Sequence, residues 1–137
     1  MTSKLRHIAI AVNDPEAAAQ FFEKAFGMTR AGQAQRGFYM TDGTMNVALL
    51  HFKDEPVPGF EKQPGFQGVI HFGMWVDNLE KAEEQIQAAG GRYMTGRKET
   101  GPNVYYEVKY KTPEGFVFDI TESGWKGAVK EVAPVKA

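Results

Sequence analysis

The chain has 137 residues, of which 42% are hydrophobic and 24% charged, enough for one ordinary domain with its own core. Its 16 basic residues nearly balance 17 acidic ones, so net charge gives no reason to expect nucleic acid or an anionic membrane as a partner. The absence of cysteine excludes disulfides, zinc–thiolate sites and cysteine nucleophiles. The first apolar run is too short for a secretory signal and no stretch could span a bilayer, so we expect a cytoplasmic protein.

An internal repeat organises the chain. The segment HIAIAVNDPEAA at residues 7–18 and the segment HFGMWVDNLEKA at residues 71–82 are similar at a fixed offset, which places His7 on His71. Each copy is typical of a strand, a capping residue, a helix and a terminating glycine. Asp14 is the expected N-cap of the first helix, and either Asp77 or Asn78 that of the second.

Three shorter β-like runs follow each predicted helix. They span residues 28–33, 37–41 and 44–53 in the first half and residues 92–97, 104–111 and 116–121 in the second. Each half is therefore a βαβββ module of a single domain at residues 1–137. Module one covers about residues 5–53, and module two about residues 67–122, with a Pro- and Gly-rich linker at residues 54–66 between them. A tail follows at residues 123–137, and we expect it to dock on a neighbour.

Strand alternation predicts where the two repeated histidines point. Bulky residues fill one face of each first strand, and the histidine shares the other face with small residues, Ala9 and Ala11 beside His7 and Gly73 beside His71. The bulky faces should pack on the helices. The two imidazoles are therefore expected to face away from the helices, toward a space left by small side chains.

The last predicted strand adds a carboxylate to this face. Phe116, Phe118 and Ile120 are expected to face the helix, which turns Asp119 the other way, where an unpaired buried carboxylate would be costly. Glu122 is the alternative carboxylate, but its parity places it on the helix side. His51 lies about four residues, or ~13 Å, beyond the position that matches Asp119, too far to bind the same metal ion.

Two neutral imidazoles and one carboxylate on converging strands suit a divalent metal and leave coordination positions open. We therefore predict a metal site of His7, His71 and Asp119, with Fe(II) or Mn(II) favoured and Zn, Ni or Co possible. The alternative is structural: histidines on strands often form hydrogen bonds only, and Asp119 could cap a turn or pair with a lysine. Two histidines at equivalent repeat positions favour the metal.

The pattern HIAIAVNDPEAAAQFFEKAFGM resembles the opening of glyoxalase, bleomycin-resistance and extradiol-dioxygenase proteins, the vicinal-oxygen-chelate superfamily. The ending TPEGFVFDI is similar to the closing motif of that group, and the resemblance covers about residues 5–122. It implies an α+β fold in which two tandem βαβββ modules form a curved mixed sheet with a metal-binding cleft. The ligand positions of the family fall on His7, His71 and Asp119.

The fourth ligand position of the family falls on Val47 or Ala48, neither of which binds metal. Glyoxalase I and methylmalonyl-CoA epimerases carry glutamate or glutamine there, which argues against both activities. The resemblance therefore implies a dioxygenase-like or lyase-like enzyme acting on a small oxygen-bearing molecule, and a homodimer. Tyr106 is the candidate acid or base, with cross-strand packing as its structural alternative.

The substrate-binding candidates are Trp75, Tyr105 and His51, the last with a structural role as the alternative. A second hypothesis is a metal-free module of the bleomycin-resistance type that binds a planar drug in an apolar groove. That groove would be lined by Trp75, Phe38, Tyr39 and Trp125. The basic residues Arg97, Lys98, Lys109 and Lys111 are interpreted as solvated surface charges, so no anion site is predicted.

Overall fold

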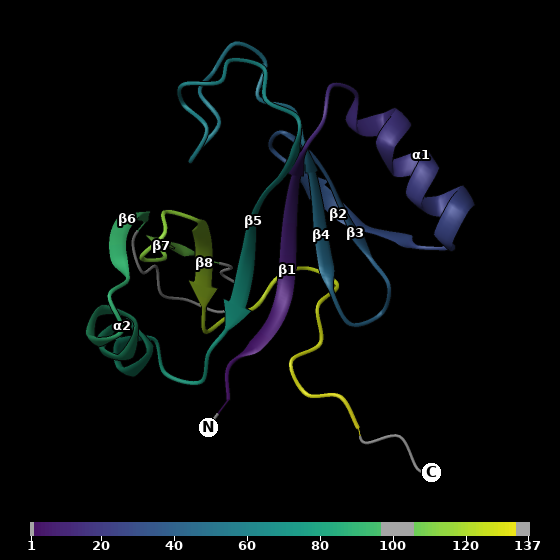
Figure 1. The fold of residues 1–137 in the computed structure, drawn as a ribbon. Helices are drawn as coiled ribbons and strands as arrows, with labels where there is room; N and C mark the ends of the chain where they lie inside the picture. Colours follow the sequence, from purple (N-terminus) through teal and green to yellow (C-terminus); the bar gives the residue numbers. More distant parts are fainter. Residues whose placement is uncertain (1, 97–105, 134–137) are drawn as a thin grey trace.

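A computed structural model describes residues 2–96 and 106–133 and contains ten elements in the predicted order (Figure 1). They are β1 (Lys4–Ala11), α1 (Pro15–Phe26), β2 (Thr29–Ala34), β3 (Gly37–Thr41), β4 (Asn46–Leu50), β5 (Gly68–Trp75), α2 (Leu79–Ala88), β6 (Arg92–Gly96), β7 (Val108–Lys111) and β8 (Val117–Thr121). The tandem βαβββ prediction is confirmed.

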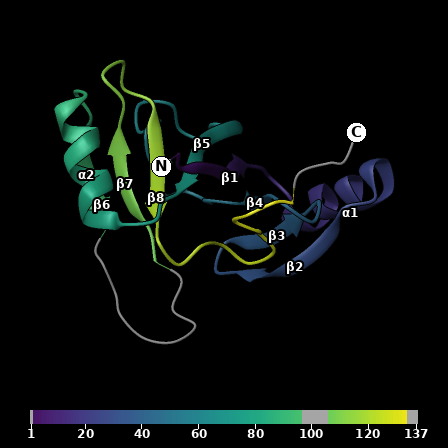
Figure 2. The same ribbon diagram turned by 90° about the horizontal axis from the view of Figure 1, so that it is seen from below.

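All eight strands form one mixed sheet in the order β2-β3-β4-β1-β5-β8-β7-β6. Antiparallel pairing of β1 with β5 joins the modules at the centre of the sheet, and the last strand of each module, β4 or β8, pairs parallel to the first. The sheet is curved, and the two helices lie at its opposite ends, α1 beside β2–β4 and α2 beside β6–β8 (Figures 1 and 2). The first and last strands of both modules therefore lie together at the middle.

The helix ends follow the chemistry of their flanking residues. The Asp14 side chain accepts a hydrogen bond from the Ala17 amide, and Gly27 ends α1 in the left-handed conformation at φ 68°. For α2 the cap is Asn78, which accepts from the Lys81 amide, so the choice between Asp77 and Asn78 is resolved.

Alternate strand residues divide between two faces, as expected. On the outer face, Met40 and Leu49 pack with Ala19 of α1, and a second cluster joins Leu79 of α2 to Ile120. On the inner face, the small side chains Ala9, Ala11 and Ala48 pack with Phe52 and Val57, which follow β4. The histidine side of the sheet is therefore the side without helices.

Three expectations about element ends are corrected. The fourth strand is shorter than residues 44–53, and within the described part of 104–111 the strand begins only at Val108. Phe116 precedes β8 and is 63% exposed rather than packed on a helix. Phe118, two residues later, is buried as predicted because β8 is already paired there.

The tail returns to module one of its own chain. The Val129 amide donates to the Thr44 carbonyl, the Thr41 hydroxyl donates to the Gly127 carbonyl, and the Arg6 side chain donates to the Val129 carbonyl. Residues 127–129 of the tail therefore pack on the body of their own chain, and docking on a second chain stays a prediction. Within residues 2–96 and 106–133, no helix has the length and apolarity needed to cross a membrane.

The core assignment predicts the cost of removing a helix anchor. Leu79 is 1% exposed, so Leu79→Ala should lower the free energy of unfolding by about 2–5 kcal/mol through lost burial and a cavity. Leu5→Ala is the matched control because Leu5 is 44% exposed, and it should cost much less. Urea denaturation measures both, and equal losses would contradict the assigned packing of α2.

Candidate metal centre

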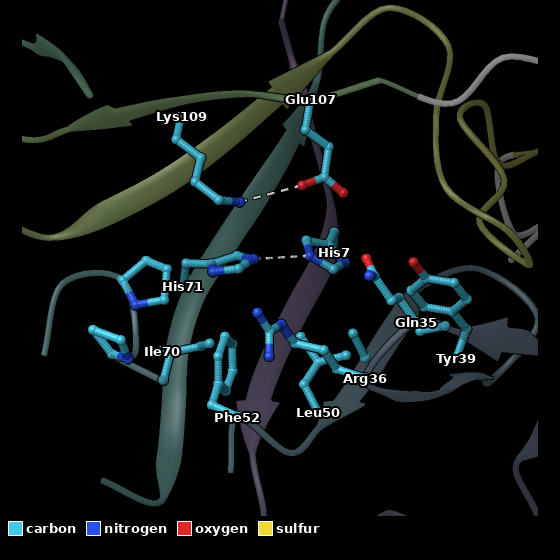
Figure 3. Close-up of a pocket in the computed structure, with 14 residues that line it drawn as sticks. His7, Gln35, Arg36, Tyr39, Leu50, Phe52, Ile70, His71, Glu107 and Lys109 are labelled. Atoms are coloured by element: carbon cyan, nitrogen blue, oxygen red, sulfur yellow. Dashed lines mark hydrogen bonds and ion pairs between the residues drawn. The ribbon is translucent and has the colours of Figure 1, made fainter. Parts of the chain in front are cut away.

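The three predicted ligands converge on one point at the middle of the sheet. His7 comes from β1, His71 from β5 and Asp119 from β8, and all three are buried. His7 Nε2 lies 3.2 Å from His71 Nε2 and 3.7 Å from Asp119 Oδ2, and His71 Nε2 lies 3.0 Å from the same oxygen. The two imidazoles face each other across the central strand pair (Figure 3).

The separations of these atoms fit one divalent ion. Donor atoms ~2.1 Å from a common ion lie roughly 3.0 Å apart at right angles and roughly 3.4 Å apart in a tetrahedron. Asp119 Oδ2 is buried and accepts no hydrogen bond within the described part of the chain, although buried carboxylate oxygens are normally satisfied. A cation among the three donors would satisfy this oxygen.

Asn46 fixes the protonation pattern of His7. Its amide nitrogen donates to the Lys126 carbonyl at 2.7 Å, which turns its Oδ1 toward His7 Nδ1, also at 2.7 Å. An acceptor at this position requires the proton on Nδ1, so Nε2 presents its lone pair to the ligand cluster. Burial lowers the His7 pKa to about 4, so the ring is neutral at pH 7.

Lys109 lies in the site, which corrects its interpretation as a solvated surface charge. Its register partner is Asp119, and its Nζ donates to Asp119 Oδ1 at 2.7 Å and to Glu107 Oε2 at 3.4 Å. Burial opposes a charged ammonium, but the carboxylates of Asp119 and Glu107 outweigh it and raise the Lys109 pKa. Lys109 thus engages one oxygen of Asp119 and leaves Oδ2 for a metal.

Glu107 is the second group of the site that the sequence did not single out. Trp125 Nε1 donates to its Oε1 at 2.8 Å, and the Trp125 ring stacks on His7 at a centroid distance of 4.7 Å. Burial, together with the negative charge of Asp119, raises the Glu107 pKa to about 8. For Asp119, burial favours the neutral form, but contacts with His71 and Glu107 and the charge of Lys109 keep its pKa below the usual value.

A cavity of about 400 Å³ opens beside the cluster. His7, His71, Glu107 and Lys109 line one part of it, and the remaining wall is formed mainly by module one and the linker (Figure 3). Those other lining residues are Ala34, Gln35, Arg36, Tyr39, Ala48, Leu50, Phe52, Pro56, Pro58 and Ile70. The volume is that of a small-molecule site.

The register identifies the fourth ligand position of the module repeat. Ala9 pairs with Ala48 as Gly73 pairs with Asp119, so Ala48 is the counterpart of Asp119. The alternative, Val47, pairs with Ile8 on the outer face. Within the described chain the site therefore has three side-chain donors and an apolar methyl group in the fourth place.

The other candidate residues lie away from this cavity. The Trp75 indole donates to the Glu122 carbonyl, and the Tyr106 hydroxyl donates to the Glu122 carboxylate on the helix side, where Tyr106 packs on the α2 cluster. His51 Nδ1 lies 3.1 Å from the Val12 carbonyl and faces a different hollow. Tyr105 lies outside the described residues, as do Arg97 and Lys98.

The proposed aromatic groove is also divided. Tyr39 lines the cavity and Trp125 stacks on His7, whereas Phe38 lies on the α1 side beneath Arg30. The four aromatic residues therefore do not form one groove.

Loss of the Asn46 side chain should weaken metal binding without removing a donor atom. We expect Asn46→Ala to lower the affinity for Mn(II) or Co(II) about 10- to 100-fold because His7 Nδ1 loses its acceptor. Asn13→Ala, at an exposed position, should leave the affinity unchanged. Competition with a chelator measures the affinity, and equal values for the two variants would refute the role given to Asn46.

Comparison with known proteins identifies the family of the chain. Residues 4–120 match the model of the Glyoxalase/Bleomycin resistance protein/Dioxygenase superfamily. The chain is 32% identical over 104 residues to an ethylmalonyl-CoA/methylmalonyl-CoA epimerase of Cereibacter sphaeroides, an alignment that covers 69% of this chain and 76% of the relative.

Two solved structures share the fold. A hypothetical protein from Bacillus halodurans C-125 superposes with a TM-score of 0.70 at 18% identity, covering 98% of this chain and 100% of the other. The Mn(II)-bound glyoxalase from Novosphingobium aromaticivorans gives a TM-score of 0.65 at 18% identity, covering 96% of this chain and 44% of that one. The chain belongs to the glyoxalase/bleomycin resistance protein/dioxygenase superfamily, with the vicinal-oxygen-chelate fold.

Proposed function

We propose that the protein is a metal-dependent enzyme that binds a small oxygen-bearing organic substrate in the cavity beside His7 and His71. The observation that carries this proposal is the buried Asp119 Oδ2, which lies 3.0 Å from His71 Nε2 and 3.7 Å from His7 Nε2 and forms no hydrogen bond among the described residues. His7, His71 and Asp119 would hold the ion. A divalent metal at this place acts as a Lewis acid toward a substrate carbonyl or hydroxyl oxygen.

Within this class we favour proton transfer at a carbon next to a carbonyl. Glu107 lines the cavity beside the ligand cluster, and burial raises its pKa above the usual range, which suits a carboxyl group that gains and loses a proton during the reaction. Trp125 fixes one oxygen of this carboxyl group. The similarity to an ethylmalonyl-CoA/methylmalonyl-CoA epimerase points to the same kind of reaction.

Ala48, at the fourth ligand position, distinguishes this protein from such an epimerase. Family members of that type resemble glyoxalase I in carrying a glutamate or glutamine at this position, and a methyl group can neither bind metal nor exchange a proton. In this chain the proton-transfer role falls to Glu107, across the cavity on the module-two side. We therefore infer that the part of the substrate near Ala48 differs in shape from the corresponding part of an epimerase substrate.

Dioxygenation is the second candidate, and a specific feature favours it. Two histidines and one carboxylate with an apolar fourth place leave several open positions, a donor set suited to Fe(II) and oxygen. Against it, the described residues place no third histidine at the cavity, since His51 faces elsewhere. Oxygen consumption by the Fe(II)-loaded protein would favour this candidate over proton transfer.

Metal content tests the site directly. We expect His7→Ala, His71→Ala and Asp119→Ala each to remove most of the bound metal, because two donors hold an ion much more weakly than three. His51→Ala is the matched control and should retain one ion per chain. Elemental analysis after dialysis measures the stoichiometry. Unchanged metal in the three site variants would favour a metal-free binding module of the bleomycin-resistance type.

Glu107→Gln should abolish proton exchange while the metal stays bound. We expect kcat to fall by about 10²- to 10⁴-fold, the usual contribution of an acid or base, with unchanged metal stoichiometry. Deuterium incorporation from heavy water, followed by NMR on methylmalonyl-CoA and a panel of ketones and thioesters, measures the reaction. Glu61→Gln serves as an exposed control. Full exchange activity in the Glu107 variant would contradict the assigned role.

A further inference from the structure

The cavity has a second charged group, far from the ligand cluster in the sequence. Arg36 lies in the turn between β2 and β3 and lines the same hollow as His7 and His71. Its guanidinium extends into the pocket below the two histidines, from the wall formed by module one (Figure 3). A small molecule that fills this hollow therefore meets both the histidines and this cation.

Two contacts hold the guanidinium in place and leave most of its N–H donors available. It lies over the Phe52 ring at 4.7 Å from the centroid, and its Nη2 donates to Glu55 Oε2 at 2.6 Å. A guanidinium has five N–H donors in a planar fork, so this one bond leaves most of them available. The Glu55 side chain is 63% exposed, and ion pairs at such positions contribute little. A second carboxylate can therefore bind without breaking a strong interaction.

The charges of the cavity are distributed unevenly. At the ligand cluster, Lys109 is already paired with Asp119 and Glu107. At the other end, Glu55, the partner of Arg36, does not line this hollow; the two residues also line a neighbouring hollow, and the Glu55 side chain is largely exposed. The interior of the hollow near Arg36 therefore presents a positive charge with a flat apolar support, Phe52, behind it.

We propose that Arg36 is the anchor for a carboxylate group of the substrate, so that the protein selects carboxylic acids whose second oxygen function lies at the ligand cluster. The placement of the second oxygen function rests on the proposed function, because the metal site determines which part of the substrate reacts. A planar carboxylate matches the guanidinium fork in a bidentate pair. Arg36 is then a specificity-determining residue, and removing its side chain should weaken the binding of carboxylic acids but not of their neutral analogues.

The chain provides a matched control for this residue. Arg30 also lies over an aromatic ring, Phe38, at 4.7 Å and also pairs with a glutamate, Glu16, but on the α1 side of the sheet. Arg36→Gln and Arg30→Gln therefore remove the same kind of stacked cation from opposite faces. Thermal unfolding of both variants checks that each remains folded.

The experiment compares benzoate with benzamide, which have the same shape and differ in charge, on metal-free protein in a low-chloride buffer. NMR titration gives the affinities, and the side-chain Nε–H signal of Arg36 locates the site. We expect wild-type protein to bind benzoate about 10- to 100-fold more tightly than benzamide, with a saturable shift at Arg36. Arg36→Gln should lose this preference, Arg36→Lys should retain part of it, and Arg30→Gln should behave as wild type.

Equal affinity for the two probes, or a benzoate preference that survives Arg36→Gln, would overturn the proposal. Because no metal is present, these outcomes are independent of metal stoichiometry. If Arg36→Gln leaves the benzoate preference unchanged while the wild-type protein binds metal, only the carboxylate anchor is refuted. If Arg36→Gln removes the preference but the wild-type protein binds no metal, the chain is a carboxylate-binding protein and the proposed enzyme is refuted.

Discussion

A carboxylate buried at the centre of the sheet constrains the rest of the site. Asp119 is fully buried, and an ionised group in that position requires compensation from its neighbours. The parallel register that pairs Asp119 with Gly73 places it beside His71, and the antiparallel pairing of β1 with β5 brings His7 to the same point. Lys109 compensates one oxygen, and the other remains directed at the two imidazoles.

The C-terminal tail is part of this arrangement. Trp125 occupies the space above Gly73, where a Cβ atom would lie 2.6 Å from its ring, and stacks on His7. The carbonyl of Lys126 orients Asn46, and Asn46 in turn orients His7. The tail therefore determines the direction of a candidate ligand and of Glu107, which Trp125 holds by a hydrogen bond. Segments separated by more than 70 residues in the chain thus meet at one cluster.

Local chemistry explains which features could be predicted from the sequence. Helix caps, strand alternation and the duplicated histidines depend on residues close together in the sequence. The module order and the convergence of His7, His71 and Asp119 could therefore be predicted from the sequence. Lys109 was missed because charge suggests exposure, although Tyr110 beside it faces α2, and this alternation turns Lys109 toward Asp119. Arg36 lies in a turn, where no periodicity indicates direction. The docking of the tail depends on tertiary contacts with Asn46 and Thr44, which its own sequence does not encode.

The proposed chemistry depends on one divalent ion held between His7, His71 and Asp119. Crystals grown with Mn(II) or Co(II) and measured at the absorption edge of the metal test it most directly. We expect one anomalous peak per chain, about 2.0–2.2 Å from His7 Nε2, His71 Nε2 and one oxygen of Asp119. A fully loaded crystal whose peak lies elsewhere, or that shows no ordered peak at this cluster, would contradict it.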